Sequence, residues 1–152
     1  MNYQDFIMEL NAEQLAFVEE LNNFLMQHKC KSTFEEKKTG LLGSYKYGKP
    51  PKALINLLLK PQGLLVRIYG EHLDNYRDFL NTLPASMVAE IDNANECKRL
   101  TQNGCSPKCL GYDFTIDKHY QKCRYSCFEF LVTNETSTAT REFVEKELLA
   151  RT

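Results

Sequence analysis

The sequence predicts one α+β domain over residues 1–152, with a mostly antiparallel sheet and helices packed on one face of it. Helix-like and strand-like periodicities occupy separate stretches of the chain, in the order helix, strands, helices, strand, helix. Turn-forming residues separate the consecutive strand-like runs. The 152 residues are 43% hydrophobic and 26% charged, which is the composition of a globular domain.

The first predicted helix begins after Asn11 and runs to about His28. Asn11 is followed three residues later by Gln14, and this pair has the form of a capping box at a helix N-terminus. Apolar residues then recur at helical spacing at Leu15, Val18, Leu21 and Leu25. We therefore expect a buried amphipathic helix.

An antiparallel meander is predicted next, from three apolar runs at residues 41–47, 53–59 and 64–69. The breaks between them are Gly48-Lys49-Pro50-Pro51 and Pro61-Gln62-Gly63, and both have the chemistry of turns. Each run is therefore expected to pair with the next one along the chain.

Helical spacing returns after Gly70 and stops at Pro84, which cannot continue a helix. A second short helix is predicted from Ala85 to about Ala94. The Cys-rich segment follows, with little periodicity of its own until residues 127–132, which read as a strand. A last helix is expected after the capping residues at 134–138, with its apolar face at Phe143, Val144 and Leu148.

The overall charge is nearly balanced, because 19 Lys and Arg face 20 Asp and Glu. This balance excludes a polycation built to coat nucleic acid and an acidic tail protein. Residues 31–67 are nevertheless basic, with eight Lys or Arg against two Glu. They are interpreted as a solvated sheet face. The alternative is a phosphate-binding surface, and hence a nucleic-acid-binding module, around Lys46, Lys49 and Lys52.

No stretch of the sequence predicts a membrane partner. The longest apolar runs, such as residues 53–59, are far shorter than a bilayer span. The first residues lack the basic and apolar regions of a secretion signal. We therefore expect a cytoplasmic protein in a reducing compartment.

Five of the six cysteines are crowded into residues 97–127, with the spacing C-x7-C-x3-C-x13-C-x3-C. Two close pairs separated by about a dozen residues are typical of structural four-cysteine zinc sites. The predicted zinc ligands are Cys105, Cys109, Cys123 and Cys127, with Cys97 as a possible substitute ligand. Nearby basic residues would offset the thiolate charge, namely Lys98, Arg99, Lys108, Lys122 and Arg124. The remaining cysteine, Cys30, is interpreted as a packed thiol.

The second cysteine pair places a condition on the zinc site. If Cys123 and Cys127 lay in one extended strand, their Cα atoms would be about 13 Å apart and could not share a metal. Zinc therefore requires a turn at residues 122–126. Two other interpretations stay open at this point, namely free or redox-active thiols and an iron–sulfur cluster.

Catalytic motifs give little support to an enzyme. The sequence contains no P-loop, G-x-G-x-x-G, G-x-S-x-G or H-E-x-x-H motif. His72 and His119 are interpreted as surface residues. The leading hypothesis is a non-enzymatic protein that binds a ligand or macromolecule. The alternative is a thiol-based redox protein or small enzyme that uses Cys123 or Cys127.

Three stretches resemble a small family of uncharacterised bacterial proteins from gut-type anaerobes: residues 63–70, 111–114 and 119–128. The resemblance covers most of the chain after about Thr33, and the Cys-rich C-terminal segment is its distinctive part. It implies a bacterial, intracellular origin. It implies no activity and assigns no role to any residue.

Overall fold

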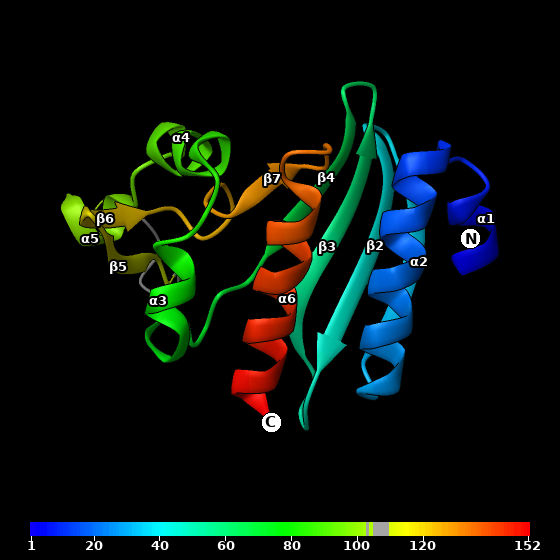
Figure 1. Cartoon of the computed structure of the whole chain (residues 1–152), viewed down its shortest axis with the longest axis horizontal. Helices are drawn as coiled ribbons and strands as arrows, with labels where there is room; N and C mark the ends of the chain where they lie inside the picture. Colours follow the sequence, from blue (N-terminus) through cyan, green and yellow to red (C-terminus); the bar gives the residue numbers. More distant parts are fainter. Residues whose placement is uncertain (103, 105–109) are drawn as a thin grey trace.

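The computed structural model describes residues 1–102, 104 and 110–152, and it confirms the α+β architecture. The main sheet consists of β1 (Lys31–Lys37), β2 (Gly40–Tyr47), β3 (Lys52–Lys60), β4 (Gly63–Ile68) and β7 (Glu129–Leu131). The strands lie in the order β1-β2-β3-β4-β7, and each neighbouring pair is antiparallel. The long helices α2 (Ala12–Gln27) and α6 (Ser137–Arg151) lie across one face of this sheet (Figure 1).

The helix α2 begins where the sequence predicts. The Asn11 side chain accepts a hydrogen bond from the Gln14 backbone N–H at 2.9 Å, and the Gln14 side chain accepts one from the Asn11 backbone N–H at 3.0 Å. The short helix α1 (Tyr3–Ile7) precedes it and has a capping box of its own. The buried face of α2 consists of Phe17, Val18, Leu21 and Leu25. Burial of each such side chain contributes about 2 kcal/mol.

The predicted meander corresponds to β2, β3 and β4, whereas β1 was not predicted. β1 is an edge strand whose side chains are mostly exposed, and its one large apolar residue is Phe34. Phe34 stands opposite Gly43 of β2 in the register. A Cβ atom at Gly43 would lie 2.8 Å from the Phe34 ring, so the glycine makes room for that ring.

The helix predicted after Gly70 is shorter than expected. A 3-10 helix, η1 (Leu73–Tyr76), and a single turn, α3 (Arg77–Leu80), replace it, and α4 (Ala85–Asn93) follows as predicted. The predicted apolar stripe is buried nonetheless, at Leu73, Tyr76, Leu80 and Leu83. η1 starts without a side-chain cap, and the His72 backbone N–H is instead bound to Glu147 of α6.

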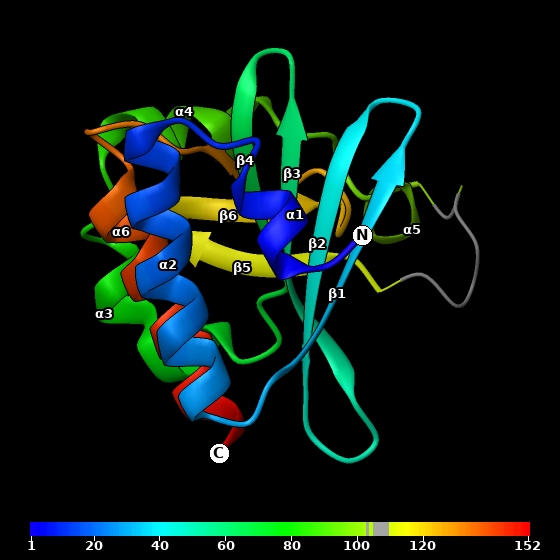
Figure 2. The same ribbon diagram turned by 90° about the vertical axis from the view of Figure 1, so that its right-hand side faces the viewer.

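A hairpin of β5 (Tyr112–Ile116) and β6 (Lys118–Lys122) lies within the Cys-rich segment and was not predicted. It forms a separate two-stranded sheet that runs crosswise to the main strands (Figure 2). The short helix α5 (Lys98–Thr101) precedes the hairpin in the chain. The turn of the hairpin contains Asp117 in the left-handed region, with φ of 60°.

Phe128 joins this smaller unit to the main core. It is 1% exposed, and its ring lies 5.1 Å from Phe114 of β5, 4.9 Å from Tyr112 of β5 and 5.1 Å from Phe143 of α6. Such aromatic pairs contribute beyond the area that they bury. The two sheets therefore share one hydrophobic core. Within the described part of the chain, no helix is long and apolar enough to span a membrane.

Candidate functional site

The turn required for metal binding is present after β6. The Cys127 backbone N–H donates to the Cys123 carbonyl at 2.9 Å, and β7 begins only at Glu129. The two cysteines therefore lie one turn apart and not along one strand. The other two predicted ligands, Cys105 and Cys109, lie outside the described residues.

Cys97 and Cys123 lie on the same side of a short antiparallel bridge. Glu96 and Lys122 form the bridge, the Cys97 N–H donates to Gln121 at 2.9 Å, and the Cys123 N–H donates to Asn95 at 2.7 Å. Side chains alternate along both segments, so the two thiols face away from the Glu96 and Lys122 side chains. Both cysteines line a cavity of about 440 Å³, together with Asn95, Glu96, Lys98, Thr101 and Gln102.

Cys127 has a different environment from Cys123. It is fully buried and belongs to the hydrophobic core, and burial raises the pKa of its thiol well above the ordinary value. Cys30 is likewise a packed thiol, as predicted, because it is 4% exposed within the core. Cys97 is buried too, but it lies outside that apolar cluster.

The thiols of Cys97 and Cys123 are the candidate metal ligands at this cavity. Among residues 1–102, 104 and 110–152, no group of three or more His, Cys, Asp or Glu side chains is arranged to hold a metal ion. The thiol pair at the cavity fits zinc by its chemistry, because thiolate is a favoured zinc ligand. A four-cysteine site then also needs Cys105 and Cys109.

Two of the basic residues expected around the thiolates are engaged elsewhere. The Lys122 Nζ is nearly buried and donates to the Asp92 carbonyl, the Ala94 carbonyl and the Glu96 carboxylate, at 3.0, 3.0 and 2.9 Å. These bonds hold the hairpin against the C-terminal end of α4. Arg124 forms an ion pair with Glu71. The charge of Lys122 nevertheless acts on the Cys127 thiol and favours its ionised form, against the larger effect of burial. Whether both cations offset the charge of metal-bound thiolates stays a prediction.

Arg124 lines a second cavity. This cavity was not predicted from the sequence. Its guanidinium carbon lies 5.3 Å from the centre of the Tyr69 ring and 5.7 Å from that of Tyr112, in cation–π geometry. Burial opposes its charge, but the bond to Glu71 outweighs that effect and raises the pKa of Arg124. The cavity has a volume of about 380 Å³ and lies between the η1 segment and β5.

The polar centre beside this cavity is Glu147 of α6, which is fully buried. Its Oε1 accepts from the His72 backbone N–H at 3.0 Å and from the Tyr76 hydroxyl at 2.5 Å. Its Oε2 lies 3.1 Å from the His72 Nδ1 and accepts from the Arg151 Nε at 2.8 Å. Burial and the neighbouring carboxylate raise the pKa of Tyr76, so its hydroxyl stays protonated and donates.

Arg151 extends this network to the sheet. Its two terminal nitrogens donate to the Ala53 carbonyl at 2.9 Å and to the Tyr69 carbonyl at 2.7 Å. Sequence reasoning missed Glu147, although a signal was present. Glu147 lies four residues after Phe143 and one before Leu148, which places it on the apolar stripe of α6. A charged residue on such a stripe is buried and needs partners.

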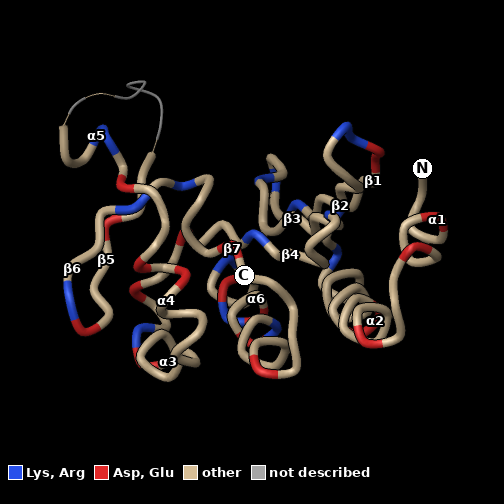
Figure 3. The backbone as a smooth tube through the Cα atoms, turned by 90° about the horizontal axis from the view of Figure 1, so that it is seen from above, with Lys and Arg blue, Asp and Glu red and all other residues tan. Residues whose placement is uncertain are grey.

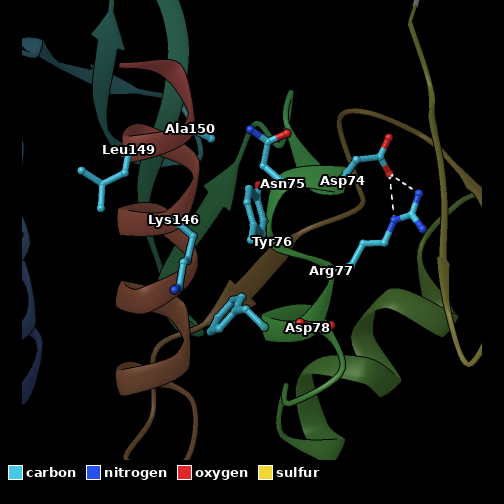
Figure 4. A pocket seen from close by; sticks show the side chains of 9 residues that line it. Asp74, Asn75, Tyr76, Arg77, Asp78, Lys146, Leu149 and Ala150 are labelled. Carbon is cyan, nitrogen blue, oxygen red and sulfur yellow. Dashed lines mark hydrogen bonds and ion pairs between the residues drawn. The ribbon is translucent and has the colours of Figure 1, made fainter.

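The other side of η1 carries an open groove against α6. It is lined by Asp74, Asn75, Tyr76, Arg77, Asp78, Phe79, Lys146, Leu149 and Ala150, as Figure 4 shows. Its charged residues include the exposed pair of Asp74 and Arg77, whose closest contact is 3.1 Å. The groove therefore has no concentrated charge of either sign.

The remaining predicted positions are on the surface. His119 is exposed on the hairpin, and its Nε2 lies 2.5 Å from the Asp113 carboxylate rather than beside a thiol. Lys46, Lys49 and Lys52 are exposed at the turn between β2 and β3. Figure 3 shows Lys and Arg along this part of the chain and acidic positions on α1 and α2.

Comparison with known proteins assigns neither a family nor a function to this chain. No protein-family model, curated protein or solved structure matches this chain. A functional proposal therefore depends on the chemistry of the chain's own residues.

Proposed function

We propose that this chain is a non-enzymatic ligand-binding protein whose Cys-rich segment is held by a structural four-cysteine zinc site. The observation that supports it most directly is the cavity shared by Cys97 and Cys123. Two thiols from separate chain segments on one wall are half of a zinc site. Metal binding would supply folding energy to the Cys-rich segment, because the ligands would tie separate parts of the chain together.

The proposed ligand set is Cys97, Cys105, Cys109 and Cys123. Cys97 replaces Cys127 in this set, because Cys127 lies in the apolar core and Cys97 faces the same cavity as Cys123. Cys105 and Cys109 are included in this set on the basis of their spacing in the sequence alone. The C-x3-C pair that they form is within the range used by zinc-binding loops.

The competing hypothesis is a redox protein or small enzyme that uses the same thiols. Cys123 is partly exposed and has Cys97 beside it, which is also what a redox pair would need. Protection of thiols does not by itself separate the two hypotheses, because Cys30, Cys97 and Cys127 are already buried in the structure by protein atoms alone. The measurement that separates the two hypotheses is the number of thiols that become reactive only when zinc is removed.

The experiment is metal analysis of freshly purified full-length protein, with thiol titration before and after a chelator. We expect one zinc ion per chain and four thiols that become reactive only after the chelator is added. Cys97→Ser should lose the zinc, whereas the matched variant Cys30→Ser should retain it. Metal-free protein in which the Cys123 thiol reacts at once would refute the zinc site and favour the redox hypothesis.

A further inference from the structure

The network around Glu147 determines which nitrogen of the neutral His72 ring carries the proton. Glu147 is fully buried, and its two oxygens accept hydrogen bonds from the His72 backbone N–H, the Tyr76 hydroxyl and the Arg151 guanidinium. The His72 Nδ1 lies 3.1 Å from Oε2 and must therefore carry the proton. In the neutral imidazole, the lone pair is then on Nε2.

The Nε2 atom of His72 is available to a ligand. The His72 side chain is 42% exposed and lines the cavity of about 380 Å³ between η1 and β5. Within the described part of the chain, the hydrogen bond of its ring is that of Nδ1 to Glu147. The backbone N–H of the same residue is also tied to Glu147, so the ring is held at two points. A preorganised acceptor thus stands at the cavity wall.

The charges around the cavity determine whether it favours a positively or a negatively charged ligand. Among the described residues that line it, Glu71, Asp74 and Asp113 are carboxylates and Arg124 is the cation. The Arg124 charge is already paired with Glu71. Arg77 likewise pairs with Asp74, whereas Asp113 has His119 as its partner in place of a Lys or Arg and is 52% exposed. The balance therefore favours a cation over an anion.

We propose that this cavity binds a small molecule carrying a protonated amine, which donates a hydrogen bond to the His72 Nε2. The volume is near the lower end of the range for small-molecule sites. Glu147 acts as a positioning residue, because it holds the imidazole in the tautomer that accepts. This inference rests on the ligand-binding part of the proposed function and is independent of the zinc site.

The test is calorimetric titration of the full chain at low salt with 1,4-diaminobutane. The controls are 1,4-butanediol, which has no charge, and succinate, which has the opposite charge. We expect saturable binding of the diamine only. Saturable binding of succinate, or equal binding of the diol, would overturn the proposal. So would the absence of heat and of amide shifts in a parallel NMR titration with the diamine.

The critical variant is His72→Asn, because the asparagine amide can replace the Nδ1 donor to Glu147 but has no group at the position of Nε2. We expect it to weaken diamine binding about tenfold or more. His28→Asn is the matched control, since the His28 Nδ1 also bonds a protein oxygen and the residue lies outside the cavity. Equal affinity in His72→Asn and wild type would contradict the proposal.

A further measurement avoids dependence on variants that fold poorly. Nitrogen-15 NMR of wild-type His72 should show that the neutral ring carries its proton on Nδ1 and not on Nε2, and the opposite tautomer would refute the assignment. Zinc content is measured on the same samples. Diamine binding in zinc-free protein would refute the zinc site alone, whereas zinc without diamine binding would refute this inference alone.

Discussion

The backbone N–H of Cys127 donates to the carbonyl of Cys123 at 2.9 Å, so the second C-x3-C pair is folded into a turn. The same turn gives the two cysteines different surroundings, since Cys123 faces a cavity and Cys127 enters the core beside Phe128. Spacing treats the two residues as equivalent, but the turn makes only Cys123 accessible to a metal or an oxidant. For this reason, Cys97 takes the place of Cys127 in the proposed set of zinc ligands.

Lys122 should contribute more to stability than any surface lysine of the hairpin. Its Nζ satisfies the carbonyls of Asp92 and Ala94 at the end of α4, together with the Glu96 carboxylate. Lys122→Met removes the donor and leaves these acceptors without it. We expect the free energy of unfolding to fall by about 2 to 3 kcal/mol, as measured by urea denaturation.

The matched control for that variant is Lys118→Met in the same strand. Lys118 is 65% exposed and pairs with the Asp92 carboxylate at 3.0 Å. An exposed ion pair of this kind contributes less than about 1 kcal/mol. Equal effects of the two substitutions would mean that the buried contacts of Lys122 are not what holds the hairpin to α4.

Gly111 should tolerate no side chain. A Cβ atom there would lie 2.3 Å from the Cys97 Sγ and 2.7 Å from the Cys97 Cβ. Gly111→Ala must therefore displace Cys97 or the start of β5, and we expect a loss of about 1 to 3 kcal/mol in unfolding free energy. If Cys97 binds zinc, the variant should also retain less metal.

Gly104→Ala provides the comparison for Gly111→Ala. Among the residues that the structure describes, the nearest atom to its Cβ would be the Lys98 Cβ at 3.5 Å, which is ordinary contact. Its effect on stability should stay within about 0.5 kcal/mol. A Gly111→Ala protein with the stability and zinc content of Gly104→Ala would show that the Cys97 contact is not close in solution.

The parts of the fold with strong local signals could be predicted from the sequence. Asn11 and Gln14 mark the start of α2, and the turn residues after Tyr47 and Lys60 separate the strands of the meander. β1 and the β5-β6 hairpin were missed because their apolar alternation is short and embedded in polar sequence. The hairpin depends on contacts from outside its own strands, including the packing of Phe128 on Phe114 and the bonds from Lys122 to the end of α4.

The candidate sites were harder to predict, because their partners are far apart in the sequence. Cys97 shares a cavity with Cys123, 26 positions later, through pairing that only the folded chain creates. Glu147 binds His72 across 75 positions, and no spacing rule connects a residue of η1 with one of α6. Only the position of Glu147 on an apolar stripe indicated that it would be buried with partners.

Cys30 should make the protein less stable in alkaline solution. Burial raises the pKa of its thiol from 9.0 to about 11, although Arg151 acts in the opposite direction. Between these two pH values the unfolded chain loses the thiol proton and the folded chain keeps it. The free energy of unfolding should therefore fall by roughly 2 kcal/mol as pH rises through this window.

The measurement is denaturation of wild type and Cys30→Ala at pH 8 and pH 11. Other buried groups also titrate in this range, so the informative quantity is the difference between the two proteins. The variant should lose less stability than wild type over this interval. Identical losses would show that the Cys30 thiol ionises as readily in the folded chain as in the unfolded one.

Substitutions in the basic turn between β2 and β3 can show whether the positive charge of residues 31–67 binds nucleic acid. Lys46, Lys49 and Lys52 are exposed, so changing all three to Gln should alter the unfolding free energy by less than about 1 kcal/mol. We expect neither protein to bind a mixed-sequence DNA or RNA oligonucleotide in a mobility-shift assay. Phosphate binding would instead give wild-type affinity that falls steeply with salt, with a slope that shrinks in the variant by about 0.7 to 0.9 for each phosphate that the lysines no longer neutralise. Salt-sensitive binding that the triple substitution abolishes would show that this turn is a nucleic-acid surface and not a solvated face.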